Sequence, residues 1–136
     1  MAIVGLNNTV GIKINSVDLS DHCTNVSLLR QFDELEVTAM GDSGHKFVKG
    51  LEASSLTIDF LNDTATGEVL QTLQAAWGTN VTVVVKQNSG AVSATNPSYT
   101  MTCLINNTTD INGAVGDLGT QSVTWNVSGT VAVATS

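Results

Sequence analysis

The chain has 136 residues, of which 42% are hydrophobic and 12% charged, and its formal net charge at pH 7 is −7. This length fits one domain whose core needs no disulfide or metal, so we expect a single domain over residues 1–136. The acidic balance argues against a protein that grips nucleic acid through a basic patch, because such a surface repels phosphate at a distance.

The first six residues carry neither a basic flank nor a long apolar run, so we expect neither a signal peptide nor a membrane span. A cytosolic start predicts that Cys23 and Cys103 stay reduced. Thr, Ser, Asn and Gly make up most of the uncharged polar residues. This composition is typical of β structure rather than of disorder.

Apolar and polar residues alternate along most of the chain, a pattern that predicts about seven strands, each with one buried face. The pattern covers residues 11–15, 23–30, 33–39, 55–60, 81–85, 101–105 and 123–127, with a turn or short edge piece at 17–21. In the segment 33–39, Leu35 and Val37 lie on one side and Glu34 and Glu36 on the other.

A polar, glycine-punctuated segment follows, and we predict it to be a long loop over residues 40–51. Tight hairpins need roughly two to five loop residues, and connections beyond about 12 are uncommon in a compact domain unless they bind something. Gly41-Asp42-Ser43-Gly44 matches part of the serine-protease nucleophile signature, and Asp21-His22-Cys23 faintly matches its histidine motif. The chain is too short for the two barrels of those enzymes, so we expect no catalytic residue.

One segment, residues 64–77, has helical spacing of its apolar residues. Asp63 or Thr64 is available as N-cap and Gly78 as the terminating glycine. We expect this helix to cover the sheet face that carries Leu56, Ile58 and Phe60, with Trp77 and Trp125 in the contact. The predicted fold is mainly β with one α-helix, an antiparallel β-sandwich or partial barrel flanked by that helix.

Other candidate sites have simpler interpretations. His22, His45 and the two cysteines lack the spacing of metal ligands, so we expect no metal and no cofactor. The carboxylates of Asp33, Glu34 and Glu36 are typical of a solvated strand face. The glycines of residues 113–119 lack the lysine and the strand-to-helix setting of a phosphate loop.

The edges of the predicted sheets lack the usual protection. The whole chain contains only five basic residues and one proline, Pro97, whereas monomeric proteins usually protect their sheet edges with Lys, Pro or bulges. We therefore expect strands to pair between subunits. A closed intermolecular barrel would remove the edges and give the polar strand faces a water-filled lumen to line.

Four strings of residues, in this order, resemble the tail tube (major tail) proteins of long-tailed bacteriophages. They run from Asn15 to His22, from Glu36 to His45, from Ser93 to Tyr99 and from Gly116 to Trp125, and the resemblance covers about residues 11–135. It implies hexameric rings that contribute strands to one inner β-barrel and stack into a tube for double-stranded DNA. It also implies a tape-measure protein and a tail terminator as partners, and a virion component assembled in the host bacterial cytoplasm. The strings lean toward non-contractile tails.

The resemblance also implies roles for individual segments, among them an N-terminal arm (1–10) and a C-terminal arm (130–136). The long loop would reach a neighbouring subunit or ring through Met40, Gly41, Asp42, Ser43, Gly44, His45, Lys46, Phe47, Val48, Lys49 and Gly50. The candidates for the lumen are Glu36, Thr57, Asp59, Thr102, Thr124 and Asn126. The alternatives are a related component of the same fold (a tube-end cap, the inner tube of a contractile tail or a secretion-system ring) and a β-sandwich module that binds carbohydrate or a host surface.

Overall fold

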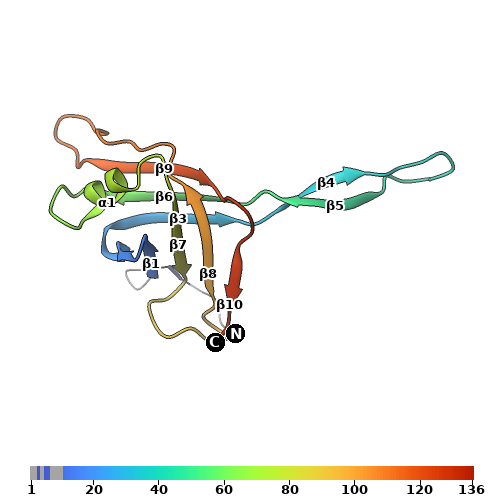
Figure 1. The fold of residues 1–136 in the computed structure, drawn as a ribbon, viewed down its shortest axis with the longest axis horizontal. Helices are drawn as coiled ribbons and strands as arrows, with labels where there is room; N and C mark the ends of the chain where they lie inside the picture. The colour runs from blue at the N-terminus through green and yellow to red at the C-terminus, as the bar shows by residue number, and fades with distance from the viewer. Residues whose placement is uncertain (1–2, 4, 7–10) are drawn as a thin grey trace.

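The computed structural model of the chain describes residue 3, residues 5–6 and residues 11–136. This part of the chain has ten strands and one α-helix: eight strands form two packed sheets, and the other two form a hairpin that projects from them (Figure 1). Every strand pair is antiparallel. The predicted fold class, mainly β with one helix, is therefore confirmed.

The two sheets share the core between them, and their strands cross at a steep angle in Figure 1. The first has the order β10-β8-β7-β1-β2 and the second the order β3-β6-β9. The first consists of β1 (Gly11–Ile14), β2 (Val17–Asp18), β7 (Asn80–Lys86), β8 (Ser98–Leu104) and β10 (Ala132–Ala134). The second consists of β3 (Cys23–Leu29), β6 (Ser55–Leu61) and β9 (Thr120–Asn126), and a short 3-10 turn, η1 (Ser20–His22), leads into β3.

The core follows from the alternation in the sequence. Side chains at every second position point inward from both sheets, and the fully buried ones include Ile14, Ile58, Phe60, Val83 and Trp125. Burying side chains of this size stabilises the fold by about 1.5–3 kcal/mol each relative to exposure. The core therefore accounts for the stability of the body without a disulfide, and both cysteines are free thiols.

The helix, α1 (Val69–Ala75), is shorter than the predicted 64–77. Gly67 has a φ of +79°, which a right-handed helix does not contain, so the helix begins only after it. Glu68 is the N-cap residue, without a side-chain cap bond, and the prediction of Asp63 or Thr64 was wrong. Gly78, with a φ of +74°, follows the last turn as predicted.

The helix packs into the predicted core but places Trp77 outside it. Val69, Leu73 and Ala76 join the same buried cluster as Phe60. Trp77 is 57% exposed, because the next residue after Ala76 is rotated by about 100° around the helix. The prediction that Trp77 lies in the core was therefore wrong.

In the described ranges, no helix is both long and apolar enough to cross a membrane.

Two predicted irregular segments contain strands. Phe47–Glu52 is β5, which pairs with β4 (Phe32–Glu36), so the interpretation of 40–51 as one loop was wrong in its second half. The ladder has a bulge between Phe32 and Glu34, and a bulge disturbs the alternation that marks a strand. In the predicted C-terminal arm, residues 132–134 form an edge strand on β8. Most of the predicted N-terminal arm lies outside the described residues.

Candidate assembly surfaces

The hairpin of β4 and β5, residues 32–52, is called the arm here. It extends well beyond the body (Figure 1) and continues the sheet directly, because β3 ends at Leu29 and β5 is followed by β6 at Ser55. At its base, the Ala53 amide donates to the Gln31 carbonyl at 2.8 Å. The arm is therefore an extension of two sheet strands, not a loop.

The tip of the arm is ordered by its own side chains. Asp42 accepts a hydrogen bond from the Ala39 amide at 2.8 Å and forms an ion pair with Lys46 at 2.9 Å. The Ala39 amide, with a further contribution from Lys46, lowers the pKa of Asp42. His45 Nδ1 lies 2.6 Å from a carboxylate oxygen of Glu36. A partner would thus meet a preformed tip rather than have to order it.

The arm has two different faces. Leu35 is opposite Val48 in the ladder, and Val37, two residues from Leu35, lies on the same side. We call these three residues the apolar stripe. Leu35 is 53% exposed, and Val37 and Val48 are each 48% exposed. Among the residues that the structure describes, none forms a layer that covers the stripe.

The opposite face of the arm is amphipathic. Glu34 is paired with Lys49 and Glu36 with Phe47. The Lys49 ammonium also lies 4.5 Å from the ring centroid of Phe32, a favourable cation–π distance. This face therefore carries both charges and aromatic rings to solvent.

A second surface is the solvent side of the three-stranded sheet. We call it the polar sheet face and define it by three rows of register partners: Asn25, Asp59 and Ser122; Ser27, Thr57 and Thr124; Leu29, Ser55 and Asn126. None of these nine described residues is Lys or Arg. The face thus offers hydroxyls and amides, with one carboxylate.

Neighbouring side chains on this face hold one another. The hydroxyls of Thr57 and Thr124 lie 3.1 Å apart. One carboxylate oxygen of Asp59 accepts a hydrogen bond from the Ser122 hydroxyl at 2.7 Å, and the other accepts one from the side-chain amide of Asn25 at 3.3 Å. Much of the hydrogen-bonding capacity of the face is therefore satisfied internally.

The two edges of the three-stranded sheet differ in how far loop residues cover them. Along β9, the Ser122 amide donates to the Thr109 hydroxyl at 2.7 Å, and the Asn107 side chain donates to the Thr124 carbonyl at 3.0 Å. These loop residues cover the β9 edge in the way that monomeric sheets protect themselves. The opposite edge, β3, is the one from which the arm continues.

Four of the six predicted lumen residues lie together. Thr57, Asp59, Thr124 and Asn126 are all on the polar sheet face. Thr102 lies on the other sheet, in β8, and Glu36 lies on the arm. A period of two reveals the solvent side of a strand but not the sheet to which the strand belongs, so the sequence could not separate these positions. Which of the six face a lumen stays a prediction.

The arm was only partly visible in the sequence. The alternation of 33–39 correctly separated Leu35 and Val37 from Glu34 and Glu36, but it implied a buried apolar side. In the structure this side is the stripe. A pattern with a period of two does not distinguish a strand whose apolar side faces the core from one whose apolar side lies on the surface of the subunit.

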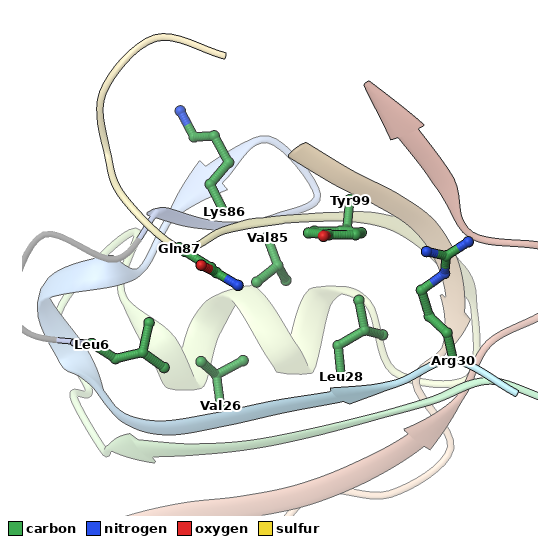
Figure 2. Close-up of a pocket in the computed structure, with 8 residues that line it drawn as sticks. All are labelled: Leu6, Val26, Leu28, Arg30, Val85, Lys86, Gln87 and Tyr99. Atoms are coloured by element: carbon green, nitrogen blue, oxygen red, sulfur yellow. The ribbon is translucent and has the colours of Figure 1, made fainter. Parts of the chain in front are cut away.

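The protease-like residues are not brought together. Ser43 is at the tip of the arm, whereas His22 belongs to the body, between Asp21 and Asp63. A cleft of about 260 Å³ lies at one end of the sandwich (Figure 2). Its lining residues are Leu6, Val26, Leu28, Arg30, Val85, Lys86, Gln87 and Tyr99. Among these described lining residues there is no carboxylate, histidine or cysteine that would act as a general base.

Comparison with known proteins gives a fold likeness only. No protein-family model and no curated protein matches the chain. A solved structure does match: a chain in the cryo-EM structure of the anti-feeding prophage baseplate, 6-fold symmetrised. The TM-score is 0.56 at 10% sequence identity, and the match covers 99% of this chain and 98% of the other. The whole chain therefore shares its fold with a subunit of that assembly.

Proposed function

We propose that the chain is a structural subunit of a phage-type tail, which assembles as stacked six-membered rings into the tail tube. The observation that carries this proposal is the arm, a preformed extension with an apolar stripe that the described residues leave about half exposed. Surfaces of this kind mark contacts with other chains. The fold shared with a chain of a 6-fold symmetrised baseplate supports assembly into six-membered rings.

The polar sheet face is the proposed lumen. Each subunit places its arm against the β3 edge of the next subunit, a head-to-tail contact of the kind that closes into a ring, and the six polar sheet faces together line the axis. Because the face lacks Lys and Arg, it gives double-stranded DNA no cationic anchor, and its carboxylate repels phosphate weakly. DNA thus passes without being held.

The partners follow from this placement. A tape-measure protein occupies the lumen before DNA leaves, and a tail terminator ends the stack of rings. The subunit is part of the virion and carries no chemistry of its own. These roles rest on the resemblance of the sequence to tail tube proteins together with the shared fold.

A second candidate is a related component that forms one ring at the end of a tube. It is favoured by one observation, that the similar solved chain belongs to a baseplate rather than to a tube. Such a subunit would have the same arm and the same polar sheet face. The two candidates differ in whether rings elongate.

The test is assembly of the purified full chain. Size-exclusion chromatography with light scattering, followed by negative-stain microscopy over a wide concentration range, should show hexamers that convert to hollow tubes. Rings that never elongate would favour the tube-end component. Monomers that persist at every protein and salt concentration would contradict both candidates.

A further inference from the structure

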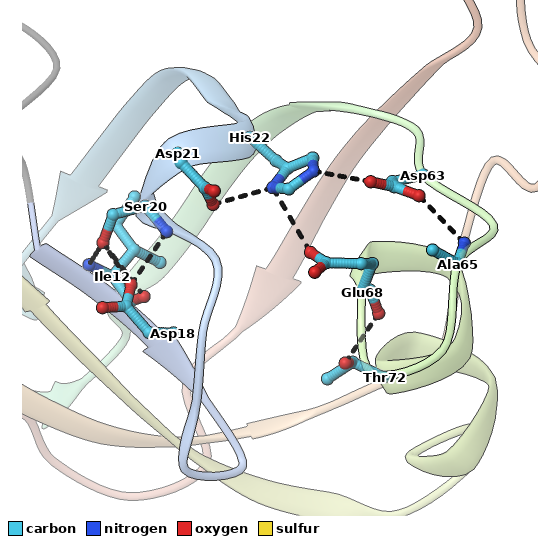
Figure 3. A network of polar contacts seen from close by, with 9 residues as sticks. All are labelled: Ile12, Asp18, Ser20, Asp21, His22, Asp63, Ala65, Glu68 and Thr72. Atoms are coloured by element: carbon cyan, nitrogen blue, oxygen red, sulfur yellow. Dashed lines mark hydrogen bonds and ion pairs between the residues drawn. The ribbon is translucent and has the colours of Figure 1, made fainter.

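A cluster of four side chains joins two segments at the end of the body that bears the helix (Figure 3). It consists of Asp21 and His22 from η1, Asp63 from the turn after β6, and Glu68 before α1. His22 Nε2 lies 2.9 Å from an oxygen of Asp63. His22 Nδ1 lies 2.8 Å from Asp21 Oδ1 and 3.5 Å from Glu68 Oε2. Both ring nitrogens therefore face carboxylates.

The position of Asp63 fixes the proton on the ring. Its Oδ1 accepts a hydrogen bond from the Ala65 amide at 2.9 Å. This bond holds the carboxylate of Asp63 in place, with its other oxygen 2.9 Å from His22 Nε2. A carboxylate there accepts a hydrogen bond from Nε2, which places the ring hydrogen on that nitrogen. A neutral imidazole has one N–H, so its Nδ1 lone pair then faces Asp21 and Glu68.

Three electron-pair donors, one nitrogen and two oxygens, thus converge on one point. With the ring hydrogen on Nε2, no hydrogen atom lies between them. Nδ1 of His22, a carboxylate oxygen of Asp21 and one of Glu68 all lie within 4.8 Å of one another. A cation at its centre, either a second ring proton or a metal ion, would stabilise this arrangement.

The distances suit a metal ion. Zinc binds nitrogen and oxygen at about 2.0–2.2 Å, which places tetrahedral ligands roughly 3.3 Å apart. The two separations from Nδ1, 2.8 Å to Asp21 and 3.5 Å to Glu68, lie on either side of this value. The carboxylate of Asp63 behind the far nitrogen is the arrangement that orients metal-binding histidines. Asp21 is largely exposed, which leaves a fourth position open to water.

We propose that Asp21, His22 and Glu68 bind a divalent transition metal ion, with zinc the best match, and that Asp63 is the positioning residue. One imidazole among the ligands favours zinc over magnesium or calcium, which prefer oxygen ligands throughout. This inference replaces the expectation that the chain has no metal site. That expectation rested on short-range spacing, and Glu68 and Asp63 lie far from His22 in the sequence.

The test uses the full chain, stripped with a chelator and kept below the concentration at which it assembles. Zinc titrated by calorimetry at neutral pH should bind with one ion per chain, and cobalt should give the intense visible absorption of a tetrahedral site. Asp63→Asn, which keeps all three ligands, should weaken zinc binding about 10–100-fold. Glu68→Gln should weaken it at least tenfold and leaves the His22 contact with Asp63 in place.

The control is His45→Gln, because His45 lies on the arm beside Glu36 and outside the cluster. It should bind zinc as the original chain does. The proposal is overturned if zinc does not saturate, or if His45→Gln reduces binding as much as Glu68→Gln. It is also overturned if the ring signals of His22 in nuclear magnetic resonance titrate with pH but do not respond to zinc, since a proton alone would then fill the cluster. Circular dichroism of each variant confirms that it is folded.

Discussion

Leu35 lies directly opposite Val48 in the arm, and about half of each side chain is exposed to solvent. Cross-strand apolar pairs stabilise a sheet most when a further layer covers them. None of the described residues forms such a layer over this pair, and contacts between subunits are the role that we propose for it.

Leu35→Asn should therefore prevent assembly with little effect on the monomer. A surface substitution of this kind changes the free energy of unfolding by about 0.5 kcal/mol or less, whereas loss of a buried contact at each of six interfaces should abolish tubes. Urea unfolding and light scattering measure the two effects. Glu34→Gln, on the opposite face, is the matched control, and equal loss of assembly in both variants would contradict a role for the stripe.

Removing the arm is a stronger version of the same test. Glu34 is opposite Lys49, so residues 35–48 can be replaced by Asn-Gly, which makes a tight two-residue turn between them. The body should keep its fold, because the arm contributes no residue to the buried core. Tubes should be lost. If this variant still forms tubes of normal length, the arm is not the contact that builds them.

At the end of the arm, Phe47→Ala should weaken assembly more than Lys46→Ala. Phe47 is largely exposed in the subunit, and aromatic residues buried at an interface contribute more than charges at its rim. Lys46 already has an ion pair with Asp42 inside its own subunit. We expect a tenfold or larger increase in the critical concentration for Phe47→Ala and less than threefold for Lys46→Ala, by light scattering. The reverse order would contradict this assignment.

A cation on the polar sheet face should make the tube retain DNA. Thr124→Lys adds a positive charge beside Thr57 on the proposed lumen, whereas Thr102→Lys adds the same charge on the other sheet. Assembled Thr124→Lys tubes should bind double-stranded DNA in a salt-dependent way, measured by co-sedimentation at low and moderate salt. Equal binding by both variants would show that the polar sheet face does not line the path of DNA.

His22 makes stability depend on pH when metal is removed. Burial lowers the pKa of His22, but the hydrogen bonds to Asp63 and Asp21 outweigh burial, and the pKa lies above the ordinary 6.5. The folded chain thus binds this proton more tightly than the unfolded chain. The resulting stabilisation is complete below the unfolded pKa and is lost as pH rises through the folded pKa.

The stability advantage of the original chain over His22→Gln should therefore shrink as pH rises above about 6.5. Urea unfolding with a chelator present, at about pH 5.5 to 9, measures it in a range where Asp63 stays ionised. In an Asp63→Asn background the same dependence should be smaller, because the partner that raises the pKa is gone. An advantage that is constant across this range would contradict the ionic role of the cluster.

The sequence predicted what depends on local alternation. The strands of the body and the buried side of each, such as Ile58 and Val83, are where the period of two places them. The end of the helix at Gly78 also followed from a local rule. The start of the helix did not, because the backbone at Gly67 sets it.

The sequence did not reveal the features that depend on contacts between residues far apart in the chain. β5 has a bulge, and β10 is a strand only because β8 lies beside it. The cluster around His22 joins η1 to the turn before α1, and no spacing rule connects residues so far apart. The sequence also could not show that Thr57 lies beside Thr124, because the register between β6 and β9 brings them together, and register is a property of the sheet.

The direct continuation of β6 from β5 has a mechanical consequence. Only Ala53 and Ser54 separate the two strands, and the Glu52 carboxylate accepts hydrogen bonds from the Val131 amide and the Ser54 hydroxyl, both at 2.8 Å. These bonds hold the junction against the C-terminal segment and oppose a hinge motion there. In the proposed assembly, a pull on the end of the arm would pass as tension into β6, the central strand of the polar sheet face, and the contact would be stiffer than one made through a flexible linker.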